Sequence, residues 1–106
     1  MKYYLSGAIT SQPDFKNYFK KYEDELHYYG IKDIFNPAAT HWPKDVKWEV
    51  CMKFDIKILM DCDCLVLLPN WEKSKGANLE TYLCRKLGIR IIEYQDLIEE
   101  LMHHGS

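Results

Sequence analysis

Residues 63–93 read DCLVLLPNWEKSKGANLETYLCRKLGIRIIE, and this stretch decides which fold the chain can adopt. Residues 63–69 form an apolar, β-rich run of the kind that is buried on both faces of a parallel sheet. A polar loop follows, and residues 76–87 then show a helical pattern that Gly88 ends. Because residues 89–93 form another strand-like run, we expect a strand–helix–strand unit with parallel strands.

The same alternation of strands and helices continues on both sides of this unit. Residues 2–6 and 32–36 are short strand-like runs, and between them a helical pattern extends from Phe15 until Gly30 ends it. Ser11 and Pro13 give that helix a start signal. A longer helical pattern covers residues 45–61, and a shorter one covers residues 95–102. The order predicts an α/β fold: a three-layer, doubly wound parallel sheet of about four to five strands, Rossmann-like or flavodoxin-like.

Length and composition indicate one globular domain. The chain has 106 residues, of which 47% are hydrophobic and 28% charged, so it can bury a core. It contains no repeat, linker or low-complexity stretch. We therefore assign residues 1–102 to a single domain and residues 103–106 to a frayed C-terminal tail.

Charge and hydropathy exclude several classes of function. The chain has fourteen Lys and Arg residues and sixteen Asp and Glu residues, and no run of basic residues is longer than two. Long nucleic acid is therefore not an expected partner. The longest apolar run, residues 64–69, is far too short to span a membrane. The N-terminus shows no signal peptide, and we expect a cytoplasmic protein.

The cysteines do not predict a metal site or disulfides. None of the four lies in a C-x-x-C pair, and each has apolar neighbours. Free, buried thiols in a reducing cytoplasm are the expected state, and we expect neither a metal nor an organic cofactor.

Two acidic residues interrupt the apolar faces of successive helices. Asp55 lies in the middle of the apolar arc of residues 45–61, and Glu80 lies on the sheet-facing side of residues 76–87. A first-turn acid suited to the helix dipole would explain Glu80, and a core acid tied to backbone or a Tyr would explain Asp55. Because the two acids occur on successive helices beside loops at one edge of the sheet, together they indicate a functional site rather than two structural acids. Such a pair can cleave glycosidic bonds, one acid ionised and the other donating a proton.

Loop residues near the same edge offer contacts for a ligand. Ser74 and Lys75 precede a helix and can seat an anion or simply cap the helix. Four further residues can stack on or hydrogen-bond a nucleobase, or can instead serve the core or an interface. These four are Asn36, His41, Trp42 and Trp71.

Several motifs resemble the nucleoside 2-deoxyribosyltransferase superfamily. They are YLSGAIT at residues 4–10, FNP at residues 35–37, the spacing of Asp55 to Cys62-Asp63, and LLPNWEKSKGA at residues 67–77 followed by Glu80. The similarity covers about residues 3–93. It is greatest to the short, phage-type branch that acts on nucleotides and includes 2′-deoxynucleoside 5′-monophosphate N-glycosidases.

The resemblance implies a role for each matching residue. Glu80 matches the nucleophile that attacks C1′ of the sugar, and Asp55 matches the second carboxylate, which works on the leaving base or positions the sugar. Ser74 matches the position that contacts a 5′-phosphate, and Gly76, two residues on, belongs with the expected substrate-binding residues. The first loop, matched from Tyr4 onward, would lie along the substrate; its residues are Gly7, Ala8, Ile9 and Thr10. Nucleotide-acting relatives place a Ser where this chain has Ala8, and Thr10 and Ser11 are candidates to supply that hydroxyl.

These observations together predict a hydrolase or transferase acting on the N-glycosidic bond of a (2′-deoxy)nucleoside or its 5′-monophosphate. The alternative is a non-catalytic module that binds or sequesters nucleotides in the same pocket. The expected partners are a small-molecule substrate and further copies of this chain, in a homodimer or higher homo-oligomer. A phage-type member would act in the cytoplasm of a host cell.

Overall fold

A computed structural model describes residues 1–9 and 14–104 of the chain. Strands and helices alternate along the sequence, as predicted. The elements are β1 (Tyr3–Ser6), α1 (Phe15–Tyr28), β2 (Ile34–Phe35), the 3₁₀ helix η1 (Pro37–Ala39), α2 (Trp48–Met60), β3 (Cys64–Leu67), the 3₁₀ helix η2 (Trp71–Lys73), α3 (Lys75–Leu87), β4 (Arg90–Glu93) and α4 (Tyr94–His104).

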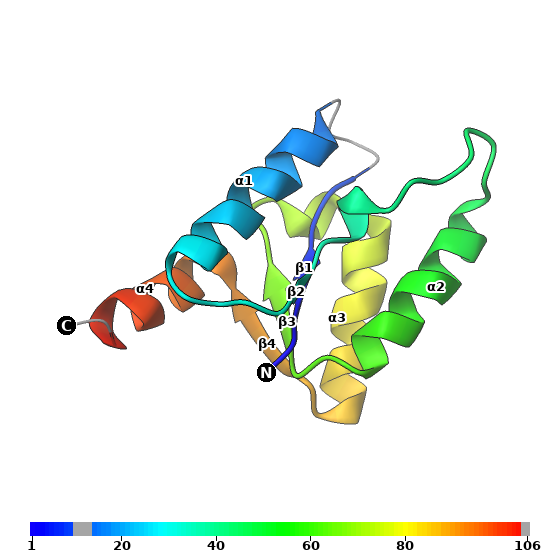
Figure 1. Ribbon diagram of the computed structural model, residues 1–106. Helices are drawn as coiled ribbons and strands as arrows, with labels where there is room; N and C mark the ends of the chain where they lie inside the picture. The colour runs from blue at the N-terminus through cyan, green and yellow to red at the C-terminus, as the bar shows by residue number, and fades with distance from the viewer. Residues whose placement is uncertain (10–13, 105–106) are drawn as a thin grey trace.

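The described part of the chain forms one parallel four-stranded sheet with the strand order β2-β1-β3-β4. Figure 1 shows α1 and α4 on one face of this sheet and α2 and α3 on the other. The predicted three-layer, doubly wound α/β fold is confirmed. The chain winds from β1 to β2 in one direction and to β3 in the other, so the strand order reverses beside β1. Ligands of such folds bind at the carboxyl ends of the strands next to this reversal.

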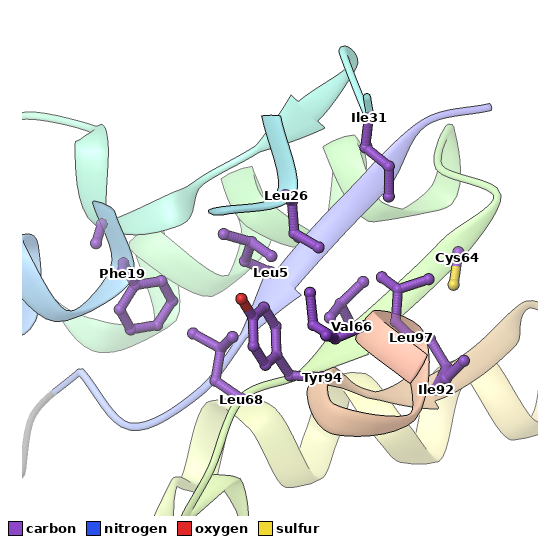
Figure 2. Close-up of a cluster of buried hydrophobic side chains, with 12 residues drawn as sticks. Leu5, Phe19, Leu26, Ile31, Cys64, Val66, Leu68, Ile92, Tyr94 and Leu97 are labelled. Atoms are coloured by element: carbon purple, nitrogen blue, oxygen red, sulfur yellow. The ribbon is translucent and has the colours of Figure 1, made fainter. Parts of the chain in front are cut away.

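Alternate residues of β1 enter two separate cores, because successive side chains of a strand point to opposite faces. Leu5 joins the cluster that packs under α1 and α4, together with Phe19 and Val66 (Figure 2). Tyr4 joins the cluster under α2 and α3, with Leu59 and Leu65. The side of β1 that carries Tyr4 is therefore the side that α2 and α3 cover.

Helix boundaries differ from the prediction in α2, α1 and α4. Helix α2 begins at Trp48 rather than near residue 45, because the Val46 N–H donates to the Pro43 carbonyl (3.1 Å) in a preceding turn. Helix α1 has Asp14 at its N-cap, whereas the predicted cap, Ser11, lies outside the described residues. Helix α4 extends to His104, so the first half of the predicted tail is helical.

Burial on α2 agrees with the helical pattern only in part. Asp55 is buried, with 6% of its surface exposed, as its place in the apolar arc predicts. Val50 and Phe54 belong to the same arc but remain 48% and 42% exposed. Figure 1 shows α2 at the margin of its layer, with α3 on one side of it. An edge helix buries only the part of its apolar arc that faces its neighbours.

The four cysteines are free, as expected. Three of them are buried, and Cys51 on α2 is half-buried. The described residues contain no cluster of ligand side chains suited to a metal ion. Within that same part of the chain, no helix is long and apolar enough to cross a membrane.

Candidate active site

A cavity of about 390 Å³ opens beside the carboxyl end of β1. Its walls come from β1 and the loop after it, the start of α1, the segment after β2, the inner side of α2 and the first turns of α3. Asp55 and Glu80 both line this cavity. The two acids that interrupt the helical patterns are thus brought together at the reversal of the strand order.

Glu80 is held by two hydroxyl groups from β1. It lies in the second turn of α3 and is only 5% exposed. The Tyr4 hydroxyl donates to Oε2 of Glu80, and the Ser6 hydroxyl donates to Oε1 at 2.7 Å. Tyr4 and Ser6 point to the same side of the strand because they are two residues apart. Both oxygens of the carboxylate are therefore fixed by the central part of the sheet.

The surroundings of Glu80 place its titration near neutrality. Burial raises the pKa of Glu80 to about 7; the hydrogen bonds from Tyr4 and Ser6 oppose this rise, and the charge of Asp55 adds to it. Burial and the Glu80 charge also raise the pKa of Tyr4 far above its ordinary value. Tyr4 consequently keeps its proton and remains a hydrogen-bond donor at any physiological pH.

Asp55 differs from Glu80 because one of its oxygens has no partner. Its Oδ1 atom is buried and accepts no hydrogen bond within the described structure. Leaving such a group unsatisfied costs about 1–3 kcal/mol, so an unpaired buried acceptor calls for an explanation. Burial raises the pKa of Asp55 to about 6. A carboxyl group that faces a cavity with a free oxygen and a pKa near 6 can receive a ligand and exchange a proton with it.

The N-terminus of α3 forms a polar end of the cavity. Ser74 caps the helix by accepting a hydrogen bond from the Ala77 N–H at 3.1 Å. Lys75 places its ammonium group 4.0 Å from the centre of the Trp48 ring on α2. At Gly76, a Cβ atom would come within 3.1 Å of the Met52 sulfur, so glycine permits α2 and α3 to approach closely here.

Aromatic side chains form much of the remaining wall. Trp42 and Trp48 both line the cavity and are half-buried. The Trp42 ring packs edge-on against Phe54, with 5.3 Å between the ring centroids and 89° between the planes. On the opposite side, Lys16 of α1 lines the cavity while its ammonium donates to the Ala38 carbonyl at 2.8 Å.

The structure brings most of the residues predicted for the site to this cavity. Those that line it are Tyr4, Gly7, Ile9, His41, Trp42, Asp55, Ser74, Lys75, Gly76 and Glu80. Ala8 is buried and is not part of the lining. Thr10 lies outside the described residues.

Asn36 and Trp71 do not reach the cavity, contrary to the prediction that they contact a base. Asn36 caps η1 by accepting from the Ala38 N–H (2.9 Å) and donates to Glu23 on α1 (3.0 Å), so its amide serves the fold. The Trp71 ring packs against the core under α2 and α3. Its buried indole N–H has no hydrogen-bond partner within the described structure.

Other lining residues were missed although the sequence carries a signal for them. Ser6 lies two residues after Tyr4 on a strand and must therefore share its face. Trp48 and Cys51 lie seven and four residues before Asp55 on α2, which places them on the same side of a helix. Thr40 and Val46 lie in an irregular loop, where no periodicity indicates the direction of a side chain.

The substitution Asp55→Asn should stabilise the fold in a pH-dependent way. Burial raises the pKa of Asp55 from 3.8 to about 6, so the folded state binds more protons than the unfolded state, and ionisation weakens folding as pH rises. We expect the variant to gain up to about 3 kcal/mol in urea unfolding at pH 8 and almost nothing near pH 4. Asp45→Asn, at an exposed site, is the matched control. A large loss of stability at every pH would show that Asp55 is a structural core acid.

Comparison with protein families gives a match over most of the chain. A family model described as a domain of unknown function (DUF4406) matches residues 1–93, which include every residue placed in the cavity. The curated proteins and the solved structures contain no match. Since the matched region extends from the first residue to the end of β4, the chain belongs to the DUF4406 family.

Proposed function

We propose that the protein cleaves or exchanges the N-glycosidic bond of a (2′-deoxy)nucleoside or its 5′-monophosphate through a covalent glycosyl-enzyme on Glu80. The observation that carries this proposal is the pair of buried carboxyl groups in one cavity, one fixed by Tyr4 and Ser6 and the other, Asp55, with a free oxygen. The resemblance of the sequence to nucleoside 2-deoxyribosyltransferases supports the same chemistry.

In the first step of the proposed reaction, an oxygen of ionised Glu80 attacks C1′ of the sugar. The bond from C1′ to the base nitrogen breaks, its electron pair stays with the base, and the protonated Asp55 supplies a proton to the leaving base. Charge develops on the sugar as in other glycosyl transfers with an oxocarbenium-like transition state. The products of this step are a free base, a glycosyl ester on Glu80 and an ionised Asp55.

In the second step, a water molecule attacks C1′ and the ester bond to Glu80 breaks. Asp55 takes a proton from this water, which restores both carboxyl groups to their starting states. If a second base replaces the water, the same step yields a new nucleoside, and the reaction is a transfer. The chemistry requires neither a metal nor an organic cofactor.

The cavity offers different surroundings to the parts of such a substrate. Its volume lies within the range of small-molecule sites. Trp42 and Trp48 present aromatic surface on which a base can stack. At the other end, Ser74 and Lys75 at the start of α3 offer a hydroxyl, a cation and free N–H groups to the 5′ end of the sugar. Free thiols and a nucleotide substrate favour a cytoplasmic location for the protein.

Replacing the nucleophile gives the most direct test. We expect Glu80→Gln to abolish release of free base from a panel of nucleosides and 5′-monophosphates, because an amide cannot form the glycosyl ester. Binding of the same compounds, followed by calorimetry, should persist. Glu49→Gln, the same change on the exposed side of α2, should retain wild-type turnover.

The outcomes of this test separate the two functions considered for the cavity. Turnover by Glu80→Gln at a near-normal rate would contradict the glycosyl-enzyme mechanism. A wild-type protein that binds nucleotides tightly but releases no base from any of them would instead indicate a nucleotide-binding module.

The pH dependence of base release should be bell-shaped. The proposed reaction needs Glu80 ionised and Asp55 protonated. With pKa values of about 7 for Glu80 and about 6 for Asp55, this is the minor form of the singly protonated pair, about one tenth as abundant as the form that carries the proton on Glu80, and its fraction is highest where the pair carries one proton. We expect kcat/KM to be highest between pH 6 and pH 7 and to fall about tenfold per unit outside that interval. A profile that stays flat from pH 5 to pH 9 would exclude this pair as the titrating groups.

We also propose that the chain forms a homodimer or a higher homo-oligomer. Val50 and Phe54 expose apolar surface on α2, and Phe54 adjoins Trp42 at the wall of the cavity. A second copy seated there would cover both the apolar surface and one side of the cavity. Sedimentation at micromolar concentration should show a species larger than one chain, which Phe54→Glu should dissociate. A fully active monomer would contradict both the assembly and a shared site.

A further inference from the structure

The Ser6 hydroxyl is a fixed hydrogen-bond donor to Glu80 that takes no part in the two chemical steps of the proposed reaction. Ser6 is the last residue of β1, is 1% exposed and donates to Oε1 of Glu80 at 2.7 Å. It belongs to the central part of the sheet, where β1 pairs with β2 on one side and β3 on the other. The direction of this donor is therefore set by the backbone of the sheet.

Hydrogen bonding is the main force that keeps Glu80 ionised. Burial and the charge of Asp55 both disfavour the carboxylate, whereas the bonds from Tyr4 and Ser6 favour it. The remaining titratable or charged groups that line the cavity or couple to Glu80 are Lys16, His41, Cys51, Lys75 and Cys84. The ammonium groups of Lys16 and Lys75 are directed toward the Ala38 carbonyl and the Trp48 ring, respectively. Neither lysine makes an ion pair with Glu80.

We propose that Ser6 is a positioning residue, whose hydroxyl keeps the Glu80 carboxylate ionised and oriented toward the cavity. Tyr4 holds Oε2 and Ser6 holds Oε1, so together they prevent the carboxylate from rotating about its last side-chain bond. Loss of the Ser6 bond leaves one oxygen of a buried anion unsatisfied. The neutral acid, which needs fewer donors, then becomes the favoured form.

Carbon-13 NMR of the Glu80 carboxyl group tests this role without any assay of activity. The resonance is assigned by its absence in Glu80→Gln and titrated in each variant. Ser6→Ala should raise the pKa of Glu80 by about one unit, the effect of losing one bond to a charged acceptor. Ser6→Cys has nearly the same size and a weaker donor, so its pKa should lie between those of the wild type and Ser6→Ala.

Thr81→Val is the matched control for removal of a buried hydroxyl. Thr81 follows Glu80 on α3 and is 2% exposed, but its hydroxyl donates to the Ala77 carbonyl of its own helix at 2.8 Å. This variant should leave the Glu80 titration unchanged. A Glu80 titration that is the same in Ser6→Ala as in the wild type would overturn the proposal.

A kinetic measurement extends the test to the reaction and rests on the proposed function. Below pH 6, Ser6→Ala should release base up to about tenfold more slowly than the wild type, because a smaller fraction of Glu80 is ionised. The ratio of the two rates should approach one above about pH 9, where Glu80 is ionised in both proteins. A deficit of the same size at every pH would contradict the proposal. If the wild type releases no base at all, the proposed function fails, and the NMR titration still decides the role of Ser6.

Discussion

A carboxylate placed in the interior of a protein must find in the protein the hydrogen bonds that water would have supplied. Glu80 finds them on β1, where Tyr4 and Ser6 donate to its two oxygens. This arrangement requires β1 and α3 to hold one fixed position relative to each other, because the strand carries the two donors and α3 carries the acceptor. Any shift of β1 by one residue would turn both hydroxyl groups to the opposite face of the sheet. The bonds to Glu80 therefore link the position of α3 to the register of the central strand.

The rest of the cavity depends on how α2 packs beside α3 on that same face. Gly76 allows the start of α3 to approach Met52, and Lys75 lies over the Trp48 ring, so two contacts between the helices occur at the polar end of the cavity. With α2 held in this way, Asp55 faces the same space as Glu80. The carboxyl end of β1 also lines this cavity, which is the expected place for a ligand site where the strand order reverses in a doubly wound sheet. One set of packing contacts thus produces both the fold and the shared environment of the two acids.

The features that the sequence predicts correctly are those with a period. Helical spacing placed Asp55 and Glu80 on inward faces, and the apolar run of residues 63–69 placed β3 in the interior of a parallel sheet. Side-chain direction in loops has no period, which is why Asn36 and Trp71 were assigned to the cavity although one caps η1 and the other packs in the core. Exposure of Phe54 was also beyond prediction, since the buried width of a helix depends on how many neighbours cover it.

The two acids are not equivalent, and the difference bears on why both are present. Glu80 has both oxygens bonded, whereas Asp55 retains a buried oxygen without a partner. For stability alone, an apolar residue of similar size at position 55 would serve the fold better than a desolvated carboxyl group. Retaining such a group weakens folding as pH rises from about 4 to about 6, and the proposed reaction, which needs the acid, would offset this loss. In the proposed reaction, the carboxylate that two hydroxyl groups hold acts as the nucleophile, and the carboxyl group with an unpartnered oxygen acts as the proton donor.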